Sequence, residues 1–67
     1  MVYIGVDLGG TNIKGALVDV QGTVLCEESR PTGAENGAEV VCDRIAEVIS
    51  SLREGLDDAA LGGIGLG

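Results

Sequence analysis

The chain has 67 residues, 45% of them hydrophobic, and a formal net charge of −7. A chain of this length forms one small domain, residues 1–67, which buries only about 60% of the surface that its unfolded form exposes. The negative charge argues against binding to nucleic acid or to an anionic membrane, although a local cluster of backbone amides can bind phosphate whatever the net charge.

Two features of the composition predict a cytoplasmic location. Cys26 and Cys42 lack zinc-binding spacing and are too few for a secreted disulfide scaffold. We expect them to be small, buried and reduced, with a disulfide as the alternative. No segment has the pattern of a signal peptide, and no apolar run approaches the roughly 20 residues of a membrane span.

The first predicted element is a β-hairpin. Residues 2–7 and 13–20 are short apolar runs rich in β-branched residues, which indicates two strands, and the hairpin segment 7–12 connects them. Gly9 and Gly10 permit a positive φ, and without side chains they let successive N–H groups converge on an anion. Thr11 and Asn12 add side-chain donors. Asp7 places a carboxylate where it can hold a hydrated divalent cation.

The same segment has a simpler interpretation. Gly-Gly followed by Thr-Asn between two strands is equally typical of a hairpin turn that binds no ligand. Turn chemistry alone leaves both interpretations open.

The next elements predict an antiparallel meander. Residues 13–20 are apolar on both faces, which indicates a central strand covered on both sides. Residues 19–22 then form a turn in which Gly22 supplies the freedom in φ. Residues 23–29 return as a third strand, and the adjacent charges of Glu27 and Glu28 suit a solvated sheet edge.

One amphipathic helix is predicted over residues 38–54, after a loop at 31–37. Asn36 is the expected N-cap, with Glu39 completing a capping box, and Gly55 is the expected stop. Apolar residues recur at intervals of three and four along one face of this helix. They are Ala38, Val41, Cys42, Ile45, Val48, Ile49 and Leu52.

The last predicted strand covers residues 62–67, in which glycine alternates with Ile64 and Leu66. We expect the bare glycine face to pack closely against something. A right-handed β-α-β crossover places this strand beside the first and parallel to it. The element order is then βββαβ, and the strand order in the sheet is 3-2-1-4.

The run V-D-L-G-G-T-N-I-K-G-A-L-V-D resembles the first phosphate motif of the actin, Hsp70 and sugar kinase superfamily. Within it the sequence is most similar to the ROK family and its bacterial glucokinases. The similarity covers almost the whole chain, because residues 62–67 resemble the strand that opens the next segment in that family. This resemblance implies the amino-terminal half domain of a ribonuclease-H-like (actin-like ATPase) α/β fold.

The resemblance also implies roles for the hairpin residues. Gly9, Gly10, Thr11 and Asn12 would wrap the β- and γ-phosphates of ATP, and Asp7 would orient Mg²⁺ through water. The family takes its general base, its sugar contacts and the His and Cys ligands of its zinc from later segments. This chain has no histidine. We therefore expect no catalytic residue in it, and an ATP-dependent hexose kinase acting on the 6-hydroxyl of glucose only in a longer protein.

Three alternatives remain at this stage. A sugar-responsive repressor of the same family would carry a helix-turn-helix before the first strand, and here that strand begins at residue 2. A non-catalytic assembly module would leave one apolar sheet face uncovered and would form a homo-oligomer. An ATPase that activates a radical enzyme is the third, although the Asn12-Ile13-Lys14 continuation looks more like the sugar kinases.

Overall fold

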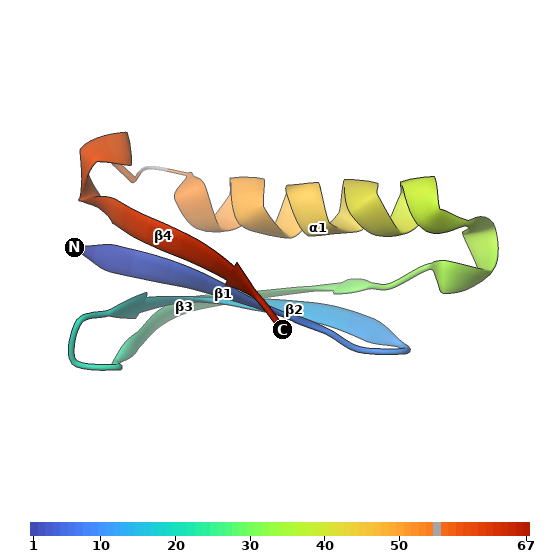
Figure 1. Cartoon of the computed structure of the whole chain (residues 1–67), viewed down its shortest axis with the longest axis horizontal. Coiled ribbons are helices and arrows are strands. Elements are labelled where there is room, and N and C mark those ends of the chain that lie inside the picture. Colours follow the sequence, from blue (N-terminus) through green and yellow to red (C-terminus); the bar gives the residue numbers. More distant parts are fainter. Residues whose placement is uncertain (55) are drawn as a thin grey trace.

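A four-stranded sheet with one helix on one face makes up the chain, as shown by the computed structural model in Figure 1. The structure describes residues 1–54 and 56–67. Strands β1 and β2 are antiparallel, as are β2 and β3, whereas β4 is parallel to β1. The order β3-β2-β1-β4 confirms the predicted sheet. The elements are β1 (Val2–Leu8), β2 (Asn12–Asp19), β3 (Val24–Pro31), α1 (Ala38–Arg53) and β4 (Leu61–Leu66).

The core lies between the sheet and α1. Alternate residues of a strand point to the same face, so Ile4 and Val6 of β1 face the helix together with Ile13 and Leu17 of β2. Burial of these side chains removes apolar surface from water, and each Å² removed contributes roughly 25 cal/mol of favourable free energy. This hydrophobic contribution is the main force that holds the sheet and the helix together. The helix contributes further members of this core, Val48 and Leu52.

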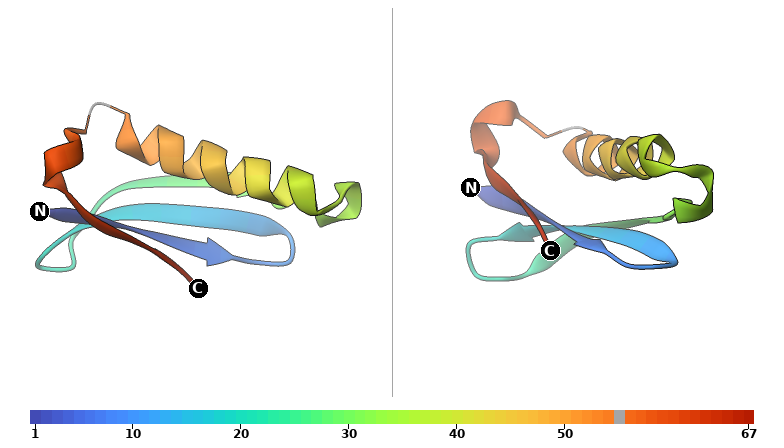
Figure 2. Two further views of the ribbon diagram at one scale, coloured as in Figure 1. Left: turned by 45° about the horizontal axis from the view of Figure 1, so that its top comes forward. Right: turned by 45° about the vertical axis from the view of Figure 1, so that its right-hand side comes forward.

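The opposite face of the sheet carries no element of the described chain, and Figure 2 shows α1 on one side only. β2 is central, as predicted, but only its helix-facing side is covered. On the other side, Lys14 is exposed and Ala16 is half buried. The expectation of a strand covered on both faces is therefore wrong for this chain taken alone.

The start of α1 differs from the prediction. Its N-cap is Gly37, with φ of 100°, and no side chain caps the helix. Asn36 instead ends a short 3-10 helix, Ala34–Asn36, in which its N–H donates to the carbonyl of Gly33. Two glycines with positive φ, Gly33 and Gly37, flank this turn. The cap lies one residue later than predicted, so the predicted capping box does not form. The predicted stop at Gly55 lies outside the described residues, and α1 ends at Arg53.

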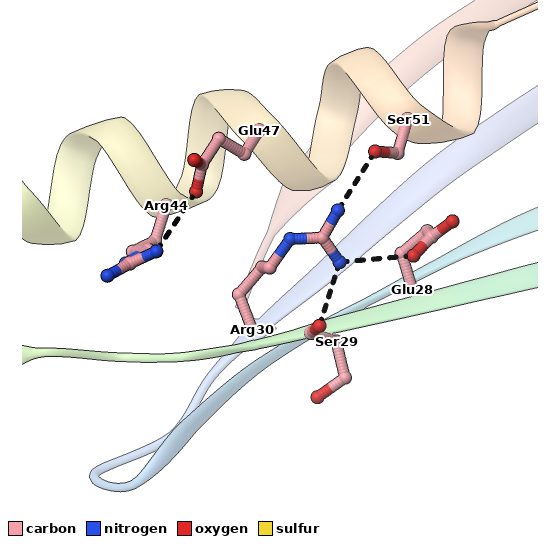
Figure 3. A network of polar contacts seen from close by, with 6 residues as sticks. All are labelled: Glu28, Ser29, Arg30, Arg44, Glu47 and Ser51. Atoms are coloured by element: carbon pink, nitrogen blue, oxygen red, sulfur yellow. Dashed lines mark hydrogen bonds and ion pairs between the residues drawn. The ribbon is translucent and has the colours of Figure 1, made fainter.

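β3 is longer than predicted and is tied to the helix by Arg30 (Figure 3). The guanidinium donates to Glu28 Oε2 at 3.1 Å and to the Ser29 carbonyl at 2.9 Å. Its second terminal nitrogen donates to Ser51 Oγ on α1 at 3.1 Å. This connection holds the end of β3 against the helix, close to where the chain leaves the sheet.

Several residues lie elsewhere than expected. Cys26 and Cys42 are both free and exposed, so the expected burial is wrong. Cys42 is not among the helix residues that pack on the core. On the glycine face of β4, a Cβ on Gly63 would lie 3.9 Å from Tyr3 Cδ1, whereas Gly65 and Gly67 have no atom that near. Ile64 and Leu66 also remain exposed. The close approach in this region occurs at Gly62, where a Cβ would lie 2.6 Å from the Tyr3 ring.

Candidate phosphate-binding site

The hairpin tip, residues 9–11, joins β1 to β2 at one end of the sheet. The N–H of Gly9 donates to the carbonyl oxygen of Asn12 at 3.0 Å and closes the turn. Neither Gly9 nor Gly10 has a positive φ; among the described residues only Gly22, Gly33 and Gly37 do. The positive φ expected at the two glycines is therefore absent, and the part of the prediction that remains is the space left by their missing side chains.

The two glycines differ in what surrounds them. A Cβ on Gly9 would lie 2.8 Å from the Asn12 carbonyl oxygen, so only glycine fits where the two strands meet. A Cβ on Gly10 would have no atom within 4 Å. Gly9 thus serves the turn itself, whereas Gly10 leaves open space in front of its backbone.

The open side of the tip carries hydrogen-bond donors. Within the described part of the chain, no hydrogen bond engages the N–H groups of Gly10 or Thr11. Thr11 is exposed, as is Asn12 at the start of β2. Adjacent backbone N–H groups that have no partner in the protein can bind an anion by donating hydrogen bonds to it, for example to phosphate oxygens.

Thr32 connects the residue after β3 to the hairpin tip by two hydrogen bonds. Its side chain is 4% exposed, and its Oγ1 donates to the Gly9 carbonyl at 2.8 Å. Its backbone N–H donates to the Thr11 carbonyl at 2.9 Å. Thr32 was not predicted as a site residue, because the third strand was predicted to end at Ser29 and Thr32 to lie in the loop that follows. The only signal was a hydroxyl residue directly after Pro31.

Asp7 lies at the end of β1 on the face turned away from α1, and its side chain is exposed. At roughly 3.4 Å per residue it stands about 7 Å along the strand from Gly9. β4 reaches the same end of the sheet, since Gly67 donates to the Val6 carbonyl at 2.9 Å and its own carbonyl accepts from Leu8 at 3.0 Å. The carboxylate therefore stands beside bare glycine backbone.

A shallow groove of about 470 Å³ passes beside Asp7 on this face. Its polar lining is Asp7, Lys14 and Glu27, and its floor includes the backbone of Gly5, Gly65 and Gly67. Lys14 Nζ and Glu27 Oε1 are 4.0 Å apart, and both side chains are more than half exposed. Water screens such a pair, so it adds little to stability. Asp7 is the residue in this groove that is closest in sequence to the hairpin tip.

The groove has two carboxylates, Asp7 and Glu27, of which Asp7 lies nearer in sequence to the hairpin tip. The described residues contain no cluster of three or more His, Cys, Asp or Glu side chains that could hold a metal ion. Mg²⁺ keeps most of its waters and often uses one or two carboxylates together with substrate phosphates, so the exposed Asp7 fits that ion. Zinc, which prefers four protein ligands in a structural site, finds no such set here.

A sequence model of the ROK family matches residues 3–67 of this chain. The chain belongs to the ROK family. The resemblance seen in the hairpin motif is thereby confirmed. The solved structure of a ROK family glucokinase from Streptomyces griseus, in complex with glucose and AMPPNP, matches 98% of the chain with a TM-score of 0.79 and 36% identity. The ribonuclease-H-like, actin-like half domain expected from the sequence is confirmed by this match.

Two further relatives are sugar kinases of bacterial origin. The glucokinase of Thermotoga maritima is 47% identical over 62 residues, which is 92% of this chain and 19% of that protein. An inorganic polyphosphate/ATP-glucomannokinase from Arthrobacter sp. strain KM matches 92% of this chain and 27% of its own, with a TM-score of 0.71 and 31% identity. The Streptomyces griseus structure is covered to 20%. This ROK chain thus spans about one-fifth to one-quarter of the length of these relatives.

The helical part of this ROK chain is short. No helix in residues 1–54 and 56–67 combines the length and apolarity needed to cross a membrane.

Proposed function

We propose that this chain is the amino-terminal, phosphate-binding segment of an ATP-dependent hexose kinase, with glucose as the substrate. The observation that carries the proposal is the hairpin tip, where the N–H groups of Gly10 and Thr11 have no hydrogen-bond partner among the described residues and a Cβ on Gly10 would meet no atom within 4 Å. The named functions of the relatives support it, since they are glucokinases and a glucomannokinase. We place the protein in the cytoplasm, where ATP is available.

Phosphoryl transfer requires mainly positioning and neutralisation of charge, and this chain offers both for the phosphates. The N–H groups of Gly10 and Thr11 would donate to phosphate oxygens, with the Thr11 hydroxyl and the Asn12 amide at the rim. Asp7 would hold Mg²⁺ through water, and the ion would neutralise part of the negative charge of the phosphates. We assign the general base that takes the proton from the sugar hydroxyl to another part of the protein.

Titration of magnesium-ATP into the complete gene product tests the proposal, with Gly10→Val as the decisive variant. The branched side chain would occupy the open space beside the Gly10 backbone. It should fit without a clash, because a Cβ at this position has no atom within 4 Å. We expect the affinity for magnesium-ATP to fall by at least about tenfold, which corresponds to the loss of roughly 1.4 kcal/mol of binding free energy.

The matched control is Gln21→Val, which adds a branched apolar side chain at an exposed position in the turn between β2 and β3. This turn lies at the opposite end of the sheet, so the control should bind magnesium-ATP like the parent. A parent that does not bind magnesium-ATP, or does not phosphorylate any hexose, would contradict the proposed function.

The sheet also favours self-association as a second proposal. On the face away from α1, Tyr3 is 39% exposed and Val24 is 51% exposed. Ile64 and Leu66 of the edge strand β4 are also exposed, on the face that carries Ile4 and Val6. Apolar area of this kind usually marks an interface, and we propose a homo-oligomer. Sedimentation equilibrium of the complete gene product checks this, and a monomer at all concentrations would contradict it.

A further inference from the structure

The contact between Thr32 and the hairpin tip joins two segments that are 23 residues apart in the chain. Thr32 is the one buried polar residue in the part of the chain that the structure describes. It directly follows β3, whose last residue, Pro31, pairs with Asn12 of β2. A buried hydroxyl needs a hydrogen-bond partner, and this one finds it in the Gly9 carbonyl rather than in its own strand.

This hydrogen bond fixes the orientation of one peptide unit. The Gly9 carbonyl and the Gly10 N–H belong to the same planar trans peptide, so they point in opposite directions. Because the carbonyl oxygen is held 2.8 Å from Thr32 Oγ1, the Gly10 N–H is turned away from Thr32. The side of the Gly10 backbone on which a Cβ would lie is also open, with no atom within 4 Å of that position.

The second hydrogen bond of Thr32 acts on the other side of the tip. Its backbone N–H donates to the Thr11 carbonyl at 2.9 Å and keeps that oxygen pointed toward β3. The carbonyl oxygens of two peptides are therefore directed at Thr32, and the N–H groups that share these peptides, those of Gly10 and Asn12, point away from it. An anion at the tip would otherwise be repelled by whichever carbonyl turned toward it.

We propose that Thr32 is a positioning residue for the phosphate site: its hydroxyl holds the Gly9–Gly10 peptide so that the Gly10 N–H points at a phosphate oxygen. The inference rests on the proposed function, because it assigns a ligand to the hairpin tip. Thr32 itself would not touch the nucleotide. Its backbone bond stays in every variant at this position except proline, so the side-chain bond can be removed separately.

The test compares Thr32→Val and Thr32→Ser in the complete gene product. Valine has nearly the shape of threonine but no hydroxyl, whereas serine keeps the hydroxyl and loses only a methyl group. We expect Thr32→Val to raise the Kd for magnesium-ATP and the KM for ATP by about tenfold, with the KM for the hexose unchanged. Thr32→Ser should return both values to within about twofold of the parent.

The matched control is Thr23→Val, an exposed threonine at the opposite end of the sheet that should leave nucleotide binding unchanged. Equal magnesium-ATP affinity in Thr32→Val and the parent would overturn the inference, and so would a failure of Thr32→Ser to restore it. A parent that does not bind magnesium-ATP would overturn the proposed function, and this inference with it.

Amide hydrogen exchange on the parent protein keeps the proposal testable if Thr32→Val folds poorly. Magnesium-ATP should slow exchange at the Gly10 N–H by at least about tenfold, because that group becomes hydrogen-bonded to the ligand. The N–H of Gln21, which donates to Asp19 Oδ1 in the turn at the far end of the sheet, serves as the internal reference. Unchanged exchange at Gly10 in the presence of saturating magnesium-ATP would overturn the proposal.

Discussion

Gly15 of β2 and Val48 of α1 lie so close together that no side chain fits on Gly15. A Cβ built there would overlap the Val48 side chain and would lie 2.8 Å from Leu52 Cδ1. Val48 and Leu52 are the two fully buried residues of the helix. The glycine therefore sets how near α1 approaches the sheet, and with it the packing of the core under the hairpin that carries the candidate site.

Gly15→Ala should destabilise the fold by about 1–3 kcal/mol, since the added methyl group forces the helix or its side chains to move. Urea unfolding followed by circular dichroism measures the change. Gly5→Ala is the matched control, because Gly5 is in the neighbouring strand and a Cβ there meets nothing within 4 Å. Equal stability of Gly15→Ala and Gly5→Ala would show that α1 packs less closely than the structure indicates.

Asp19 should stabilise the turn between β2 and β3 through its side chain. Its Oδ1 accepts hydrogen bonds from the N–H of Gln21 at 2.9 Å and of Thr23 at 3.0 Å. Asp19→Ala removes both and should cost about 1 kcal/mol at this exposed site. Asp19→Asn keeps the oxygen acceptor and should unfold close to the parent. Thermal unfolding compares the two, and an equal loss in both variants would contradict the role of the acceptor.

Arg30 and Ser51 should be energetically coupled, because they connect β3 to α1 over 3.1 Å (Figure 3). A double-mutant cycle with Arg30→Met and Ser51→Ala measures the coupling free energy directly. The guanidinium is about one-third exposed, so we expect only about 0.5–1 kcal/mol. Strictly additive effects of the two substitutions would mean that the contact contributes nothing to the link between strand and helix.

The sequence predicts the order of elements well because each element has its own periodicity. Apolar residues alternate along β1, and in the helix they recur as Val41, Ile45, Val48 and Leu52. Both patterns depend on local geometry and can therefore be recognised in a single sequence. The parallel placement of β4 follows from the handedness of the crossover. These rules also locate the hairpin, and with it the five residues predicted for the phosphate site.

What the sequence does not predict depends on contacts between distant segments. Thr32 binds Gly9 across 23 residues, and no local pattern indicates that pairing. Gly15 is required by Val48 and Leu52, which lie more than 30 residues later in the chain, and the N-cap shift from Asn36 to Gly37 follows from a 3-10 turn. The burial expected for Cys26 and Cys42 is likewise wrong, since both are exposed.

Asp7 is predicted to make nucleotide binding dependent on Mg²⁺. If its carboxylate holds the hydrated ion beside the phosphates, Asp7→Asn should weaken the binding of magnesium-ATP by about tenfold or more and leave the weaker binding of metal-free ATP almost unchanged. Isothermal titration of the complete gene product, with Mg²⁺ and with a chelator, measures both affinities.

Glu27→Gln is the matched control for Asp7→Asn. Glu27 lines the same groove, and its substitution by glutamine removes the same single negative charge. Glu27 belongs to β3, however, and its Oε1 lies 4.0 Å from Lys14 Nζ. A general effect of net charge would act on both variants alike, whereas a metal contact affects only Asp7→Asn. Equal loss of magnesium-ATP affinity in the two variants would therefore assign the effect to the field of the groove and remove Asp7 from the metal site.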